Sequence, residues 1–239
     1  MGDAPLVATP APVHLRRRPP EPLLSPADPT YADRGREPLI NAPLVPLVLS
    51  LLLIGLFPFQ LSYNGSALGL LALIPAHVGA GEWVSLLTHQ FLHGSWPHVI
   101  LNALGLLAFG APVARLLGPG GRGGVLFLAF FLVCGVLAGL GFVLLHPGGV
   151  QAVVGASGAV AGLMAAASRL IERPGRLGGF GSRPVIGMAA GWLAINILAA
   201  VFGTLPGAGG AGIAWEAHLA GYAAGLLLIG PVARLAGRR

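Results

Sequence analysis

Few polar side chains interrupt the apolar stretches of this sequence, and four of them have the types needed for nucleophilic chemistry. Ser157 lies in VVGASGAVAG (153–162), His218 in AHLAG, and His98 and Asn102 in HVILN. A serine hydroxyl is a weak nucleophile that needs a neighbouring base, and an imidazole can serve as that base. A histidine and an asparagine four residues apart share one face of a helix, from which they could donate hydrogen bonds to a developing oxyanion. These residues predict serine-based hydrolysis, provided that the elements carrying them meet.

The composition places those elements in a membrane. Of the 239 residues, 55% are hydrophobic and only 9% are charged, whereas charged residues make up about 25% of a typical soluble domain. A chain this apolar predicts a polytopic membrane protein and argues against a water-soluble hydrolase. The G-x-S-x-G motif of many such hydrolases is also absent around Ser157, because Ala159 occupies the last glycine position.

The hydropathy pattern predicts an all-α fold with six membrane-spanning helices. Each apolar stretch is close to the ~20 residues that a helix needs to cross a bilayer. The predicted spans are residues 41–60, 98–117, 124–145, 153–171, 184–203 and 214–233. The first loop is long and carries tryptophans and leucines, so we expect short amphipathic helices that lie in the outer interface.

All 14 basic residues are arginines, and all of them fall on one side of the predicted bundle. By the positive-inside rule, both termini of this multi-pass protein of the inner (plasma) membrane are then cytoplasmic. The net charge of +6 is thereby explained without nucleic acid. Residues 1–40 hold nine of the 21 prolines and five arginines, so we expect a disordered cytoplasmic tail there. Residues 236–239 form a second, short cytoplasmic tail.

The polar residues are predicted to lie at one depth. Spans two, four and six run in the same direction, from outside to inside. His98, Ser157 and His218 lie 17, 12 and 16 residues before the first arginine that follows each of them. At ~1.5 Å per residue, these side chains are about 18–25 Å above the inner charged boundary. All of them therefore fall in the outer half of the membrane.

Small residues predict that the fourth and sixth spans cross closely. The fourth span has Gly158-x-x-x-Gly162, and the sixth has Gly221-x-x-x-Gly225. Glycines four residues apart let two helices pack tightly. If those faces meet, the serine of one span and the histidine of the other come within hydrogen-bonding distance.

The sequence favours a Ser-His dyad over a complete triad. The only acidic residue within the predicted spans is Glu216. It is two residues before His218 and therefore faces away from it on a helix. Asn196, in the fifth span, is interpreted as a packing residue and left out of the site.

At these residues the sequence resembles the rhomboid family of intramembrane serine proteases, over about residues 41–235. The motifs that carry the resemblance are His98-x-x-x-Asn102, Gly155-Ala156-Ser157-Gly158 and Ala217-His218-x-x-Gly221-x-x-x-Gly225. The resemblance implies a six-helix protease domain that cleaves transmembrane segments of protein substrates in the lipid bilayer. It implies no cofactor and no metal.

The same resemblance implies a role for each polar residue. Ser157 would be the nucleophile and His218 the base. His98, Asn102 and the backbone amide of Ser157 would form the oxyanion site. Family members often have an aromatic residue four positions after the serine, where it stacks on the catalytic histidine, but here that position is Ala161. Tyr222, one turn after His218, is a candidate substitute.

Three other functions account less well for the sequence. The main alternative is a catalytically inactive, rhomboid-like pseudoprotease that binds membrane helices, although such proteins usually lose the serine or the base. A channel or transporter would be expected to have inverted repeats or charged groups near the midplane, and the sequence has neither. His89 and His93 could bind zinc, but a clear third ligand is missing.

The glycine-rich loop 204–214 carries no charge. We expect it to be a mobile cap above the site, with the fifth span tilting to admit substrate.

Overall fold

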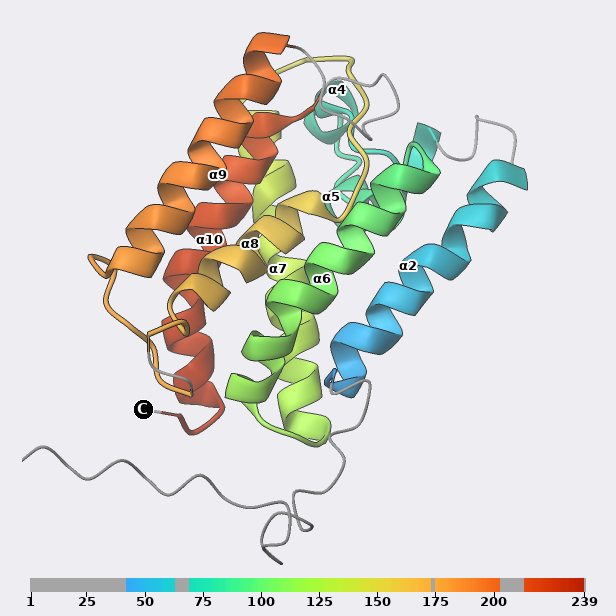
Figure 1. The fold of residues 1–239 in the computed structure, drawn as a ribbon. Helices are drawn as coiled ribbons and strands as arrows, with labels where there is room; N and C mark the ends of the chain where they lie inside the picture. Colours follow the sequence, from blue (N-terminus) through green and yellow to red (C-terminus); the bar gives the residue numbers. More distant parts are fainter. Residues whose placement is uncertain (1–41, 63–68, 173–174, 203–212, 239) are drawn as a thin grey trace, which may run out of the picture. The chain divides into compact units, whose positions relative to one another are not determined.

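The computed structural model describes residues 42–62, 69–172, 175–202 and 213–238. The predicted tail 1–40 and most of the predicted cap lie outside these residues. Within them the fold is all-α, as predicted. The elements are α2 (Leu44–Ser62), α4 (Pro75–Gly79), α5 (Ser85–Thr88), the 3₁₀ helix η1 (His89–Phe91), α6 (Trp96–Leu117), α7 (Gly121–Leu145), α8 (Ser157–Ser168), α9 (Arg183–Phe202) and α10 (Trp215–Leu235) (Figure 1).

Five helices in the described part of the chain are long and apolar enough to cross a membrane: α2, α6, α7, α9 and α10. Each begins and ends within a few residues of a predicted span. The chain is therefore a membrane protein with at least these five candidate spans, and the sixth predicted span needs a correction.

The fourth predicted span, 153–171, is wrong in its extent. Helix α8 has only 12 residues and starts at Ser157 itself. Before it the chain is extended, and Val153 exchanges two backbone hydrogen bonds of 2.8 and 3.0 Å with Leu73. Gly155 then adopts a φ of +122°, which glycine tolerates and which a helix cannot contain. Hydropathy does not distinguish an extended apolar segment from a helical one.

Helix α8 is a core element. It contacts α6, α7, α9 and α10 and lies in the middle of the bundle (Figure 1). Ten of its twelve residues are buried. At ~1.5 Å per residue it is about 18 Å long, well short of the ~30 Å hydrocarbon layer. The other helices surround it, so it places its first residue deep in the bundle instead of at a membrane surface.

Helices α8 and α10 cross with their backbones in contact. A Cβ atom added to Gly221 would overlap the carbonyl group of Gly158, and one added to Gly225 would overlap the carbonyl group of Gly162. Only glycine fits at these positions of α10, because the obstacle is backbone, which cannot rotate away as a side chain could. The close approach brings the first turns of the two helices together.

The first loop supports the segment that leads into α8. Besides the bridge to Leu73, the amide of Gly155 donates to the carbonyl of His89 at 2.9 Å. The amide of Ala76 donates to the carbonyl of Gly149, also at 2.9 Å. The short helices α4, α5 and η1 thus hold the extended segment from one side. Their predicted position in the membrane interface stays a prediction.

Helix α9 is the least embedded of the long helices. Where burial is described along it, only Val185, Asn196 and Ala199 are buried. Most of its other side chains are apolar and exposed, as expected for a helix that faces lipid. A buried asparagine on such a helix needs a polar partner.

Candidate active site

The start of α6 fixes two of the predicted polar residues. The Ser95 hydroxyl accepts a hydrogen bond from the amide of His98 at 3.3 Å and so caps the helix. Pro97 lies in the first turn, where its ring fixes the backbone φ at a helical value. His98 and Asn102 consequently lie one turn apart, and Asn102 Nδ2 donates to the His98 carbonyl at 3.0 Å.

A backbone contact determines which nitrogen of His98 carries the hydrogen. The amide of Gly94 donates to His98 Nδ1 at 3.4 Å. Because Nδ1 accepts, the hydrogen of the neutral imidazole is on Nε2. Nε2 lies directly beside Gly155, where an added Cβ would be only 2.7 Å from it. The glycine therefore leaves room for the His98 ring to reach the cavity.

Ser157 is the first residue of α8. The first amides of a helix have no partner within the helix, so the Ser157 backbone N–H is available to a ligand. The positive end of the helix dipole also lies here and favours negative charge.

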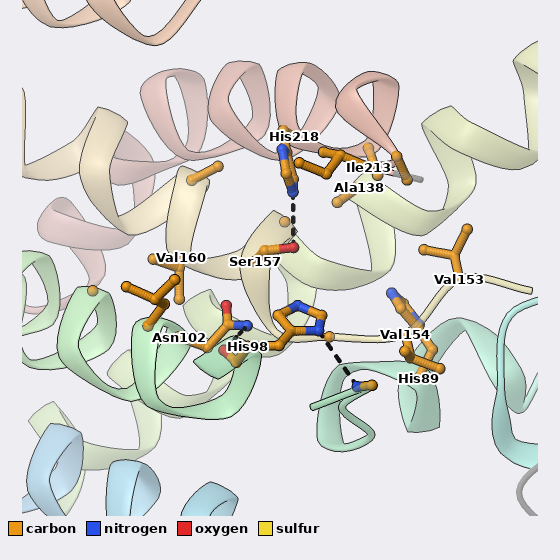
Figure 2. A pocket seen from close by; sticks show the side chains of 18 of the residues that line it. His89, His98, Asn102, Ala138, Val153, Val154, Ser157, Val160, Ile213 and His218 are labelled. Atoms are coloured by element: carbon orange, nitrogen blue, oxygen red, sulfur yellow. Dashed lines mark hydrogen bonds between the residues drawn. The ribbon is translucent and has the colours of Figure 1, made fainter. Parts of the chain in front are cut away.

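Ser157 and His218 are in direct contact. Nε2 of His218, in the first turn of α10, lies 2.8 Å from Oγ of Ser157 (Figure 2). The two residues are 61 positions apart in sequence, and the glycine crossing of α8 and α10 brings them together.

Asn196, which the sequence analysis interpreted as a packing residue, is buried and also contacts this cluster. Its Oδ1 lies 3.0 Å from Nδ1 of His218, and its Nδ2 donates to the carbonyl of Trp192 at 2.8 Å. The depth argument could have found it. Asn196 is 13 residues after Arg183, or about 20 Å above the inner boundary, which is the layer of the other polar residues.

An aromatic residue does lie against the His218 ring, but it comes from α9. The ring centroids of Trp192 and His218 are 5.5 Å apart, with a tilt of 41°. The suggested substitute, Tyr222, packs instead with Ala161, Met164 and Ala165. The small Ala161 is thus compensated from a neighbouring helix.

Glu216 points away from the cluster, as its helical position predicts. Its Oε1 lies 3.5 Å from Nε2 of His146, at the end of α7. His146 in turn stacks on Phe142, with ring centroids 4.3 Å apart. This pair ties α7 to the first turn of α10 without touching His218.

The polar residues line a cavity of about 370 Å³. Figure 2 shows His218 and Ser157 on one side of it and His98 and Asn102 facing them. The rest of the wall is largely apolar and includes Val153, Val154, Val160, Met164 and Ile213. The cavity therefore brings a serine hydroxyl, imidazoles and a side-chain amide together within a largely apolar wall.

His89 and His93, the two histidines considered as zinc ligands, are both buried, and His89 is part of the cavity wall. Nδ1 of His89 lies 2.8 Å from the carbonyl of Ser85, so it donates there. Burial lowers the pKa of His89 to about 4 and that of His93 to about 3, which keeps both neutral. Across the residues that the structure describes, no three His, Cys, Asp or Glu side chains are grouped to hold a metal ion.

The comparisons with known proteins point to one family. The model of the Rhomboid domain matches residues 80–234. No curated protein sequence matches the chain. The matched region extends from the first loop into the last turn of α10 and contains Ser157, His98, His218, Asn102 and Asn196. Since this match covers more than half of the sequence, the chain belongs to the rhomboid family.

Proposed function

We propose that this chain is an intramembrane serine endopeptidase that cleaves transmembrane segments of membrane proteins with a Ser-His dyad. The observation that carries the proposal is the 2.8 Å contact between Ser157 Oγ and His218 Nε2 inside a cavity. A serine that only packs helices would bond to its own backbone. Here it is paired with an imidazole, a group that can remove its proton.

The reaction would run in two halves. The Ser157 oxygen adds to the carbonyl carbon of the scissile peptide bond while its proton moves to Nε2 of His218. As the C–N bond breaks, His218 gives that proton to the leaving amine, and an acyl-serine remains. A water molecule then adds to the acyl carbon, His218 takes and returns its proton, and the serine is released.

Three donors would stabilise the negative oxygen that forms in each half. They are Nε2–H of His98, an N–H of the Asn102 amide and the backbone N–H of Ser157. They come from the first two turns of α6 and the first residue of α8, and they adjoin one cavity. Donors fixed in place before the reaction stabilise the transition state without reorganisation.

The apolar cavity wall favours a substrate segment from the membrane. From the arginine distribution we further propose that both termini are in the cytoplasm. The protein would then lie in the inner (plasma) membrane with six membrane-crossing segments, of which α8 is the short one. The site then lies in the outer half of the bilayer and takes its water from that side. Proposed partners are transmembrane protein substrates and the bilayer itself.

Covalent labelling by a fluorophosphonate probe in detergent tests the proposal. Wild type, Ser157→Ala and His218→Ala should be compared side by side. We expect labelling of wild type alone, because phosphonylation needs both the hydroxyl and its base. Ser182, which is half-buried and lies directly before α9, is not part of the cavity wall, so Ser182→Ala serves as the matched control and should label like wild type.

The alternative reading, a pseudoprotease that binds membrane helices, predicts a different result. Correctly folded wild-type protein would then resist the probe while still retaining a transmembrane peptide in reconstituted vesicles. That pair of outcomes would replace the endopeptidase proposal.

A further inference from the structure

His218 makes a contact that proton transfer from Ser157 does not require. Its Nδ1 lies 3.0 Å from Oδ1 of Asn196, a residue of α9 that is 1% exposed. Asn196 is absent from the cavity wall, so it stands behind the imidazole. We propose that Asn196 is a positioning residue that holds His218 in the tautomer able to accept the serine proton, an inference that rests on the endopeptidase function proposed above.

The hydrogen-bond pattern leaves Asn196 one orientation. Its Nδ2 donates to the carbonyl of Trp192 at 2.8 Å, and a carbonyl can only accept. Oδ1 therefore faces His218, where it too can only accept. Nδ1 of the imidazole must carry the hydrogen, and Nε2 of the neutral ring is left with its lone pair toward Ser157. An unpartnered imidazole could instead carry its hydrogen on Nε2 and would then compete with the serine proton.

The same contact fixes the plane of the ring. The bond to Ser157 anchors one edge of the imidazole, and Asn196 anchors the opposite edge. Trp192, from the same helix, covers the ring at a centroid distance of 5.5 Å. One turn of α9 thus supplies both a hydrogen-bond partner and an aromatic neighbour, at a site where Ala161 of α8 can supply neither.

A packing role alone does not account for an asparagine at this position. The neighbouring positions of α9 are mostly apolar and exposed, and a buried amide must satisfy its polar atoms. Leucine has the same branched skeleton and would be free of that requirement. Packing does not need the acceptor oxygen Oδ1 of Asn196, whereas the hydrogen bond from Nδ1 of His218 does.

Three substitutions separate positioning from packing. Asn196→Leu keeps the branched skeleton and removes the acceptor, Asn196→Asp keeps an acceptor oxygen, and Ile197→Ala alters an exposed neighbour as a control. We expect Asn196→Leu to lower kcat on a transmembrane substrate, and the rate of fluorophosphonate labelling, by about 10-fold or more, since a histidine in the wrong tautomer is a poor base. KM should change little, because Asn196 does not line the cavity. Asn196→Asp should stay within a few-fold of wild type.

The proposal would be overturned if Asn196→Leu and Asn196→Asp lost kcat equally. It would also be overturned if Asn196→Leu kept its kcat while its unfolding temperature stayed unchanged. Activity of the wild type together with either result would leave the endopeptidase function intact.

The tautomer of His218 can also be measured without any activity. ¹⁵N NMR of histidine-labelled protein in detergent, with the His218 signals assigned by their loss in His218→Gln, distinguishes hydrogen on Nδ1 from hydrogen on Nε2. We expect Nδ1–H in wild type and a shift toward Nε2–H in Asn196→Leu. Nε2–H in wild type would refute the role of Asn196 even if the chain proved to be an active protease, and Nδ1–H would support it even in a chain without hydrolytic activity.

Discussion

His98 and His218, two of the imidazoles that line the cavity, are held in opposite tautomers. Nδ1 of His98 accepts from the Gly94 amide at 3.4 Å, and Nδ1 of His218 faces the acceptor oxygen of Asn196 at 3.0 Å. Both rings turn Nε2 toward the cavity, so one offers a hydrogen and the other a lone pair. The same side chain thus presents a donor and an acceptor to one substrate group, and the partner on the far nitrogen makes the difference.

The donor role of the α6 residues predicts a loss of rate more than of affinity. Removing one donor from an oxyanion site lowers kcat by about 10²–10³. We expect His98→Phe and Asn102→Ala each to reduce kcat in this range, with a smaller change in KM, in steady-state cleavage of a transmembrane substrate. Ile100→Ala, at an exposed position of the same helix, is the control. An unchanged kcat in both variants would remove these residues from the mechanism.

The buried histidines of the first loop predict acid sensitivity. Their folded pKa values, about 4 for His89 and about 3 for His93, lie below the ordinary 6.5. Below pH 6.5 the unfolded chain therefore binds more protons than the folded one, and stability falls as the pH drops toward 4 and 3. We expect the unfolding temperature in detergent to decrease through this window.

Replacing the more strongly shifted group should flatten that dependence. Neither ring nitrogen of His93 has a hydrogen-bond partner within the described residues, so His93→Leu removes a proton-binding site at small structural cost. A variant that loses stability on acidification as steeply as wild type would show that other groups cause it.

Sequence reasoning found four of the cavity residues because each stands out against an apolar background. His98, Asn102, Ser157 and His218 also share a depth, which follows from counting residues. Asn196 shares that depth, yet it was excluded because a single sequence does not say which helix faces lie against each other. Only the packing of α9 on α10 reveals that its amide meets an imidazole.

At the scale of elements, the crossing of α8 and α10 decides whether Ser157 and His218 meet at all. A Cβ at Gly225 would overlap the Gly162 carbonyl, and overpacking of this kind costs about 1–3 kcal/mol. We expect Gly225→Ala to lower the unfolding temperature and to slow fluorophosphonate labelling, since the helices must separate to admit the methyl group.

A glycine elsewhere in the bundle provides the control for that substitution. An added Cβ at Gly191, on α9, has no atom within 4 Å. Gly191→Ala should leave labelling unchanged and hold or raise stability, because alanine favours a helix over glycine by up to ~1 kcal/mol. If both substitutions had the same effect, close packing at the crossing would not be the cause.

The long helices could be predicted because length and hydropathy alone specify them. The short helix could not, since VVGA before Ser157 is as apolar as the helix that follows it. The pairing of Val153 with the first loop keeps this segment extended, and Gly155, with its positive φ, lies between it and the helix. Both are tertiary features that a hydropathy window does not register.

At the scale of the whole molecule, the arginines predict how the protein sits in the membrane. Cys134 is the single cysteine and is buried, so a Cys134→Ala background allows single-cysteine mapping. In intact cells, a membrane-impermeant maleimide should label Glu82→Cys, in the first loop, and should reach Arg176→Cys only after permeabilisation. Both positions are exposed. The reverse pattern would invert the proposed orientation and place the cavity toward the cytoplasm.

Helix α9 carries the residue that contacts His218 yet buries few of its own side chains, and in the proposed protease this combination would impose an order of events. A substrate segment that pushes α9 aside to reach the cavity takes Asn196 away from His218, so a widened entrance and an oriented imidazole exclude each other. Cleavage then waits until α9 has closed again. Bulky segments that keep the helix open would occupy the cavity uncut, whereas slender or locally unwound ones would be hydrolysed. Substrate selection would then depend on whether α9 can close before the bound segment dissociates.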